Sequence, residues 1–189
     1  MIRICEETDA LLIVDLQNDF ITGSLAVPGA EGILQKVKEY TEKFLCRFAS
    51  RDWHPEDHSS FVENGGPWPA HCIAGTEGSE LHSILDDHWF IQIYKGLDKN
   101  KEQYSAFDGT NIAELLKRFK IKRLFVCGLA TDYCVKATVL DALKQFEGAV
   151  FLLADATTAV NVNQGDGVRA VMEMLKKGAI GITIEDIEE

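Results

Sequence analysis

Apolar residues in this chain form short continuous runs that alternate with segments of helical periodicity. Continuous runs predict strands buried on both faces, as in a parallel sheet. Six strands are predicted in this way, the second of them from a weak signal, and they are residues 10–14, 48–50, 89–94, 124–127, 150–154 and 180–184. Between them, apolar side chains recur every three or four residues, which predicts helices. The predicted helices are residues 31–48, 111–119, 131–146 and 166–177.

This alternation predicts a doubly wound α/β fold, a six-stranded parallel sheet with helices on both faces. The apolar positions of each helix are expected to face the sheet, and in the last helix these are Val168, Val171, Met172 and Leu175. A length of 189 residues without a repeat or linker predicts a single domain, residues 1–189. In such folds ligands bind beyond the carboxyl ends of the strands.

Charge and cysteine content exclude several classes of function. The formal net charge is −11 and no basic cluster occurs, so neither nucleic acid nor an anionic membrane is an expected partner. No apolar run approaches the ~18 residues of a membrane span, and residues 1–7 lack the apolar core of a signal peptide. The five cysteines are an odd number without a CxxC pair, which argues against a disulfide framework and predicts a cytoplasmic location.

The fourth predicted strand leads through Gly128 directly into a helix, and Cys134 lies in the first turn of that helix. Thr131 or Asp132 could cap the helix. The positive end of the helix dipole favours a thiolate at Cys134, and free N–H groups of the same turn could stabilise an oxyanion. The alternative is a small, buried, inert cysteine.

Polar residues at the other strand ends favour the catalytic interpretation of Cys134. A cysteine nucleophile needs a base, and no histidine lies at the end of a central strand. Asp15, after the first strand, is the available base, and Lys95, after the third, could pair with it. Taken singly, these residues could be a loop carboxylate and a surface lysine. Their convergence on one crevice predicts a catalytic group of Asp15, Lys95 and Cys134.

A second group of polar residues follows the second predicted strand. Alternate residues of an extended segment point the same way, so Asp52 and His54 could bind one ion. His71 could complete the set from the long irregular segment that follows, and His58 is a candidate extra ligand. A carboxylate with imidazoles suits one divalent metal, with zinc favoured over iron or manganese. The alternative is an ordinary polar surface loop.

These residues lie in motifs that resemble the nicotinamidase/pyrazinamidase branch of the isochorismatase-like cysteine hydrolases. The resemblance covers nearly the whole chain. Its motifs are LLIVDLQNDF (11–20), SRDWHPEDHSSF (50–61), WPAHCIAGTEG (68–78), YKG (94–96), YSAFDG (104–109) and GLATDYCV (128–135). RDWH with WPAHC is typical of nicotinamidases, whereas the Asp, Lys and Cys positions are typical of the whole superfamily.

The resemblance implies hydrolysis of nicotinamide to nicotinic acid and ammonia, as a step of NAD salvage, with pyrazinamide as a side substrate. It implies a catalytic triad and a metal site formed by the two groups described above. It also implies a cis peptide between Leu129 and Ala130, with the N–H groups of Ala130 and Cys134 as the oxyanion hole. Three aromatic residues are expected to enclose the substrate ring, and these are Phe20, Trp68 and Tyr104. Some relatives add a fourth metal ligand, here near His58 or near residues 63–64.

Three alternatives stay open at this point. Another amidase of the superfamily, acting on a ureido or carbamoyl amide, would share the triad, and an isochorismate-type hydrolase would leave the cysteine and metal motifs without a role. A non-catalytic nucleotide-binding domain would share the fold, but neither a G-x-G-x-x-G nor a Walker loop follows a strand. A homo-oligomer is compatible with the sequence, which does not specify the oligomeric state.

Overall fold

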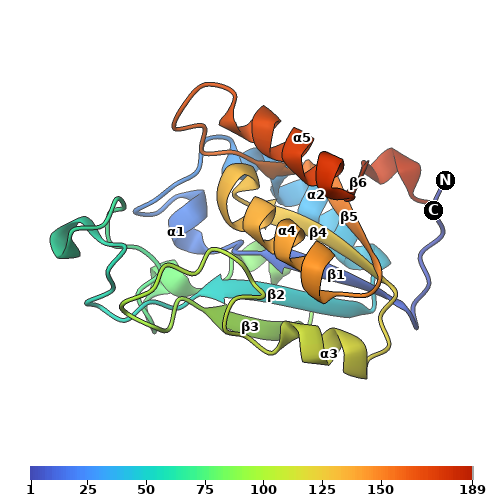
Figure 1. The fold of residues 1–189 in the computed structure, drawn as a ribbon, viewed down its shortest axis with the longest axis horizontal. Coiled ribbons are helices and arrows are strands. Elements are labelled where there is room, and N and C mark those ends of the chain that lie inside the picture. Colours follow the sequence, from blue (N-terminus) through green and yellow to red (C-terminus); the bar gives the residue numbers. More distant parts are fainter. Residues whose placement is uncertain (189) are drawn as a thin grey trace.

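The computed structural model describes residues 1–188 and has one six-stranded sheet at its centre (Figure 1). All strand pairs are parallel, and the order across the sheet is β3-β2-β1-β4-β5-β6. The strands are β1 (Asp9–Val14), β2 (Cys46–Asp52), β3 (Ile91–Lys95), β4 (Arg123–Leu129), β5 (Ala149–Thr158) and β6 (Ile180–Ile182). The predicted six-stranded parallel sheet is confirmed.

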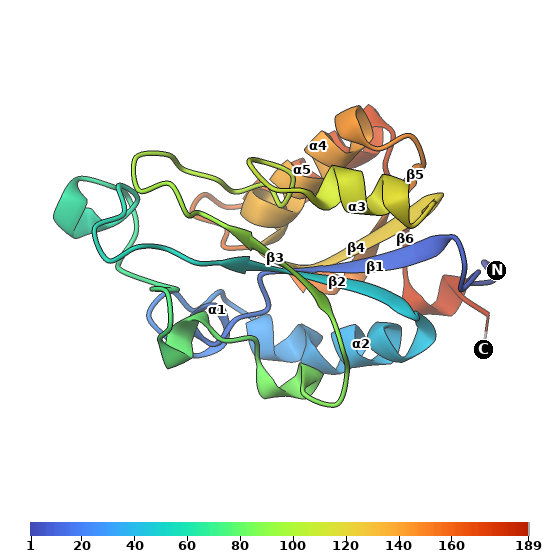
Figure 2. The ribbon, with the colours of Figure 1, turned by 90° about the horizontal axis from the view of Figure 1, so that it is seen from below.

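Helices cover both faces of the sheet, as Figure 2 shows edge-on. Two lie on one face and three on the other. The first pair is α1 (Asn18–Ile21) and α2 (Ala30–Lys43), and the three opposite are α3 (Ile112–Arg118), α4 (Lys136–Gln145) and α5 (Asp166–Lys177). No helix among residues 1–188 is long and apolar enough to cross a membrane.

Strand β1 shows why the sheet needs two helical layers. All six of its residues are buried. Leu11 and Ile13 belong to the hydrophobic cluster that includes Tyr40 of α2, and Leu12 belongs to the opposite cluster with Leu116 of α3. Burying one such aliphatic side chain contributes about 1.5–3 kcal/mol, so the apolar run fixes β1 at the centre of the molecule.

The first crossover differs from the prediction. Helix α2 ends at Lys43 rather than at residue 48, and β2 begins at Cys46. Phe44 and Phe48 are both buried, at a spacing that fits a helix as well as a strand. Phe44 already has an extended backbone, and its ring packs at a tilt against Phe125 of β4, so contact with the sheet ends the helix here.

The short helix α1 was not predicted, and the other elements match the predicted ones in order but differ at their ends. Strand β5 extends four residues beyond the predicted end at 154, and β6 ends at Ile182 before a 3₁₀ turn. Trp89, predicted to begin the third strand, precedes β3 and is 70% exposed. The long segment between β2 and β3 is irregular, as predicted, apart from three short 3₁₀ turns.

Helix α5 has the predicted length but not the predicted orientation. Of the four residues expected to face the core, Val171 is partly buried and packs against it. Val168 and Met172 are each 65% exposed, and Leu175 is 41% exposed. The residues that pack inward are Gly167, Ala170 and Met174. The buried face thus combines the small residues Gly167 and Ala170 with one large one, Met174, while Val168 and Met172 point outward.

Gly128 joins β4 to the turn that carries Cys134, and its position requires glycine. Its φ is +108°, and a Cβ atom there would lie 2.1 Å from the carbonyl oxygen of Val14. Since that atom belongs to the backbone of the central strand, it cannot move aside cheaply.

We therefore expect Gly128→Ala to destabilise the fold by more than about 3 kcal/mol, combining backbone strain with a main-chain clash. Urea denaturation monitored by circular dichroism measures this loss. Gly32→Ala is the matched control, because nothing lies within 4 Å of a Cβ there and the site is inside α2. Equal stability of the two variants would contradict this role of Gly128.

Candidate active site

The carboxyl ends of three neighbouring strands bring the predicted catalytic and metal-binding groups together. Asp15 directly follows β1, Asp52 is the last residue of β2, and Lys95 is the last residue of β3. Asp52 and Lys95 are direct partners in the β2–β3 register. The turn after β4 adds Cys134 from the other side of β1. Parallel pairing therefore places all four side chains at one edge of the sheet.

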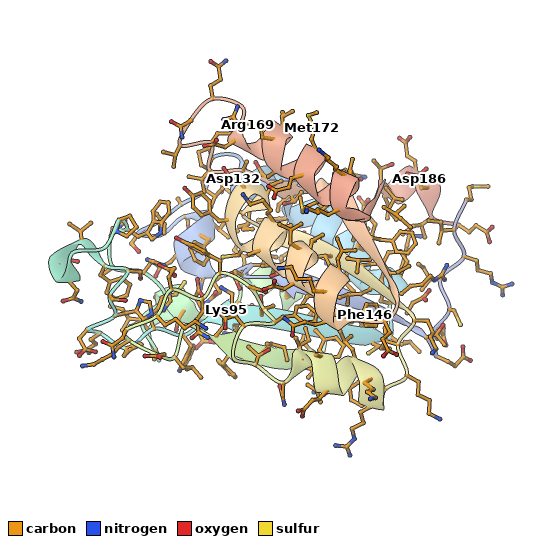
Figure 3. The ribbon with its side chains drawn as sticks, viewed as in Figure 1. Lys95, Asp132, Phe146, Arg169, Met172 and Asp186 are labelled. Atoms are coloured by element: carbon orange, nitrogen blue, oxygen red, sulfur yellow. The ribbon has the colours of Figure 1, made fainter. Side chains whose placement is uncertain are left out.

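Lys95 lies at the centre of this group, and Figure 3 labels it at the end of the sheet to which the strands point. Its Nζ atom is 2.9 Å from Oδ2 of Asp15, 2.6 Å from Oδ1 of Asp52 and 3.6 Å from Sγ of Cys134. It also donates to the backbone carbonyl of Gln103 at 3.3 Å. The lysine side chain is completely buried. The surface-lysine alternative is therefore wrong.

Asp15 is held in place by strand β2. Its Oδ1 atom accepts a hydrogen bond of 2.6 Å from the hydroxyl of Ser50, and its backbone N–H donates to the carbonyl of the same serine at 3.2 Å. Its φ of +49° is uncommon for a residue with a side chain and turns the carboxylate away from the strand direction. Backbone strain of this kind is typical of functional positions.

Burial sets the protonation of the group. It raises the pKa of the Cys134 thiol well above its usual value, and Asp15 and Asp52 add to the rise while Lys95 only partly offsets it. Burial also raises the pKa of Asp15, against the attraction of Lys95. At Asp52 burial is outweighed by Lys95 and His54, so this pKa is lowered. The expectation that the turn favours a resting thiolate is therefore wrong, because the loss of water outweighs the helix dipole.

The turn that carries Cys134 is a π-helical turn (Thr131–Val135) in front of α4. The peptide between Leu129 and Ala130 is cis, as the resemblance implies. No side chain caps this turn, so the predicted capping role of Thr131 or Asp132 is wrong. The carboxylate of Asp132 instead accepts hydrogen bonds from the backbone N–H groups of residues 160 and 161, at 2.9 and 2.8 Å. These two hydrogen bonds connect the turn to the loop after β5.

Asp52, His54 and His71 form a second buried group in which one ligand atom of each lies within 4.8 Å of the others. Nδ1 of His54 is 3.0 Å from the carbonyl of Gly96, and Nδ1 of His71 is 2.7 Å from the carbonyl of Pro69. A carbonyl only accepts, so both Nδ1 atoms carry a proton, and in the neutral imidazoles that bind a metal both Nε2 atoms keep a lone pair. Nε2 of His54 is buried and has no hydrogen-bond partner among the described residues. This donor set fits a divalent transition metal.

Residues around the metal-site group hold its side chains in place. The side chain of Gln17 bonds to the backbone N–H and carbonyl of Asp52, both at 2.8 Å. The carboxylate of Asp19 accepts from the backbone N–H of Cys72 at 2.7 Å, beside His71. Gly96 has a φ of +69°, and a Cβ there would overlap the ring of His54 at 2.4 Å. The alternative of an ordinary polar loop therefore does not describe this segment.

His58 lies beside the metal-site group, but its geometry argues against a role as ligand. Its ring is 4.1 Å from that of His54, between centroids. The backbone N–H of Ser60 donates to its Nδ1 atom at 3.2 Å, and the hydroxyl of Ser60 lies 2.7 Å from the same atom. A nitrogen that accepts an N–H bond carries no proton, so neutral His58 is protonated on Nε2. In that tautomer Nε2 has no lone pair for a metal, although the atom is buried and, like Nε2 of His54, has no hydrogen-bond partner among the described residues.

Neither residue of the 63–64 pair faces the group in this structure. Glu63 is exposed to solvent, and the side-chain amide of Asn64 donates to the backbone carbonyl of His58 at 3.0 Å. The described residues thus bring together a three-residue ligand set without the fourth ligand considered from the sequence.

A pocket opens in front of both groups and holds about 450 Å³ of empty space, its open mouth included. Cys134, Asp52 and His71 line it, while Asp15 and Lys95 lie behind the thiol. The other lining residues are mainly apolar or aromatic, and they are Phe20, Leu25, Val27, Trp68, Glu102, Tyr104, Leu129, Ala130, Tyr133 and Val160. The three aromatic residues expected around a substrate ring are thus all at the pocket.

Three of the aromatic side chains support one another. The indole N–H of Trp68 donates to the hydroxyl of Tyr104 at 3.1 Å, and both rings pack against Tyr133. Sequence reasoning missed Tyr133, Glu102 and Val160. Tyr133 lies within the GLATDYCV motif, so its neighbour Cys134 could have indicated it, whereas Glu102 and Val160 come from loops whose course the sequence pattern does not give.

The family model of the isochorismatase domain matches residues 9–186. The chain belongs to the isochorismatase family. It is 37% identical to the nicotinamidase of Escherichia coli over 95% of this chain and 97% of that protein. The isochorismatase-like fold inferred from the sequence is thereby confirmed.

Two solved structures of this family are also similar. A pyrazinamidase of Pyrococcus horikoshii in complex with zinc is 42% identical, with a TM-score of 0.85 over 93% of this chain and 99% of that chain. PnC1 of L. infantum in complex with nicotinate is 36% identical, with a TM-score of 0.92 over 99% of this chain and 98% of that chain.

The assignment of imidazole protons leads to a prediction about zinc binding. We expect His54→Ala and His71→Ala to weaken zinc binding by more than about 100-fold, since even changes to groups behind metal ligands cost 10–100-fold. His58→Ala should still bind one equivalent of zinc. Isothermal titration of metal-free protein measures both quantities.

Circular dichroism of each variant keeps folding separate from metal affinity, because His58 is itself buried. A folded His58→Ala protein that no longer binds zinc would contradict the proton assignment, and so would tight binding by either of the other two variants.

Proposed function

We propose that this protein hydrolyses nicotinamide to nicotinic acid and ammonia through a thioester at Cys134, a step of pyridine nucleotide salvage. The observation that carries the proposal is the meeting of two buried groups, Asp15–Lys95–Cys134 and Asp52–His54–His71, at one aromatic pocket. The similarity to nicotinamidases and to a structure holding nicotinate supports the same substrate. Pyrazinamide, the amide after which the zinc-bound relative is named, is the expected side substrate.

Asp15 is the general base in this proposal. The raised pKa of the thiol means that Cys134 rests protonated, so its proton must be removed as the sulfur attacks the carboxamide carbon. Burial raises the pKa of Asp15 too, which makes it a stronger base than an exposed carboxylate. Asp15 then returns the proton to the leaving nitrogen, since an amide ion is too basic to depart, and water hydrolyses the thioester.

Lys95 keeps a positive charge among the reacting groups. The carboxylates of Asp15 and Asp52 hold its pKa well above the usual value despite burial. Its ammonium stabilises the sulfur as negative charge develops there. We assign the oxyanion hole to the backbone N–H groups of Ala130 and Cys134, both of which line the pocket.

The pocket walls suit a flat heteroaromatic amide. We assign Phe20, Trp68 and Tyr104 to the enclosure of the ring, and Tyr133 supports the latter two. Phe20 is also part of the hydrophobic core, so one side chain both packs in the core and borders the pocket.

One divalent ion, zinc by preference, would be held by Asp52, His54 and His71. Their carboxylate and imidazole atoms fit zinc, which a similar pyrazinamidase binds, and iron or manganese remain compatible with the same set. Bound there, the ion would supply a Lewis acid to which a pyridine nitrogen can be a ligand. The amide end of the substrate would then lie at Cys134, where the N–H groups assigned to the oxyanion hole hold it.

The direct test is incubation with nicotinamide while ammonia and nicotinic acid are measured. We expect Cys134→Ala to abolish turnover, by at least about 10⁴-fold, because removal of a nucleophile leaves only residual catalysis. Cys5→Ser is the matched control, since Cys5 lies outside the pocket and should keep full activity. Release of carbon dioxide from a carbamoyl amide, with nicotinamide untouched, would favour the ureido amidase instead.

A comparison of two substrates tests whether the site recognises the ring nitrogen of nicotinamide. Benzamide has the shape of nicotinamide but lacks this nitrogen. A site built to bind a polar atom rejects an analogue without it by up to about 10⁴-fold. We expect kcat/KM for benzamide to be lower by at least 10³-fold. Comparable kcat/KM values for the two amides would contradict the assignment.

A further inference from the structure

The turn that carries Cys134 is fixed in shape by its own backbone but not in place. It is a π-helical turn (Thr131–Val135), a rare form that is mostly found at functional sites. The N–H groups of residues 133 and 135, on either side of Cys134, both bond to the carbonyl of Ala130, at 3.0 and 3.1 Å. No side chain caps the turn. Its position relative to the sheet therefore depends on bonds to other elements.

Asp132 makes such a bond to the loop after β5. The residue is only 7% exposed. Its Oδ1 atom accepts from the N–H of Val160 at 2.9 Å and its Oδ2 atom from the N–H of Asn161 at 2.8 Å, so both carboxylate oxygens are used. Hydrogen bonds to a charged carboxylate are about twice as strong as bonds between neutral groups. Figure 3 labels Asp132 beneath the end of α5 that carries Arg169.

The charge of Asp132 is met by these two N–H groups and not by a basic side chain. Lys136 and Arg169 line a surface groove together with Asp132. Lys136 is instead 3.9 Å from Glu173, and Arg169 pairs with Asp166 at 2.6 Å. Two consecutive N–H groups need an acceptor with two oxygens and no donor, a form that aspartate has and asparagine lacks. The loop that is bound thus explains the residue type.

The loop that Asp132 holds is part of the pocket, because Val160 is one of the lining residues. On its other side the loop is attached to α5. The side-chain oxygen of Asn161 accepts from the N–H of Gly167 at 2.9 Å, and a Cβ at Gly167 would lie 2.5 Å from that of Ala159. The loop is therefore enclosed between α5 and the turn, and the turn contacts it through Asp132.

A second hydrogen bond runs beside this one. The hydroxyl of Thr131 lies 2.7 Å from the hydroxyl of Thr157 in β5. Thr131 is buried as well. The turn thus reaches β5 and its loop through two consecutive side chains, and Asp132 is the one that also fixes a wall of the pocket.

We propose that Asp132 is a positioning residue that holds the thiol of Cys134 and the pocket wall at Val160 in one fixed geometry. The inference rests on the proposed function, in which Cys134 attacks the substrate. Sγ of Cys134 is 3.6 Å from Nζ of Lys95, and Asp132 lies two residues before it in the same turn. A misplacement of ~1 Å at a reacting group can cost about 10²-fold in rate. A displaced turn would therefore slow the reaction in a folded protein.

Alkylation of Cys134 by iodoacetamide, followed by peptide mass spectrometry, tests the proposal without nicotinamide. In Asp132→Asn an NH₂ group faces one of the two backbone N–H groups, so one hydrogen bond is lost. We expect Cys134 of this variant to react at least about tenfold more slowly. Asp132→Ala loses both bonds and should react more slowly still. Cys5, which lies outside the pocket, is the internal reference and should react at the natural rate.

Steady-state hydrolysis of nicotinamide gives a second measurement. We expect kcat of Asp132→Asn to fall by about 10- to 100-fold. Val160→Ala keeps the backbone N–H that Asp132 binds, so it should raise KM more than it lowers kcat. Asp155→Asn is the matched control. Asp155 also joins β5 to other elements, through the hydroxyl of Tyr40 and the N–H of Ile184, but it lies outside the pocket and the variant should keep the natural kcat and alkylation rate.

Urea denaturation establishes which variants are folded. Should Asp132→Asn not fold, Thr131→Val decides on the same measurement, because it loses the bond to Thr157 and should also slow alkylation of Cys134. An unchanged alkylation rate or kcat in folded Asp132→Asn, equal losses in the Asn and Ala variants, or the same loss in Asp155→Asn would each overturn the proposal. Slowed alkylation in a protein that leaves nicotinamide intact would instead overturn the proposed function and support the role of Asp132.

Discussion

The ammonium of Lys95 is the charge on which the site depends. It is completely buried and lies within 3 Å of carboxylate oxygens of both Asp15 and Asp52. Burying a lysine or a carboxylate without a partner costs several kcal/mol, so none of the three charges would persist alone. Because Asp52 belongs to the metal-site group and Asp15 to the catalytic group, one lysine joins the two groups into a single electrostatic unit.

This unit exists because three parallel strands end side by side. The apolar runs of β1 and β4 place those strands at the centre of the sheet, and β2 and β3 follow in order on one side. Backbone features then direct the side chains: the positive φ of Asp15, the close approach at Gly128 and the contact of Gly96 with His54. In the proposed reaction this arrangement would let a neutral thiol act as the nucleophile, since Asp15 and Lys95 both lie behind it.

Much of this could be predicted from the sequence, because it depends on strand order. Continuous apolar runs identify buried strands, and the polar residues after them must converge at one edge, which is how Asp15, Asp52, Lys95 and Cys134 were found. The protonation of Cys134 could not be predicted, since it depends on how many tertiary contacts exclude water. The boundary between α2 and β2 was missed because Phe44 and Phe48 fit two periodicities. The outward face of α5 was missed because an apolar stripe does not say which partner covers it.

The central claim is that a buried, protonated Cys134 becomes acylated during turnover. Acid quenching of the enzyme during steady-state hydrolysis of nicotinamide, followed by peptide mapping with mass spectrometry, tests it most directly. The account predicts a nicotinoyl group on the peptide that contains Cys134 and none on the peptides with Cys72 or Cys127, which are also buried. Trapping with hydroxylamine should convert the same intermediate to the hydroxamate. Rapid turnover with no acylated Cys134 and no hydroxamate would contradict the account.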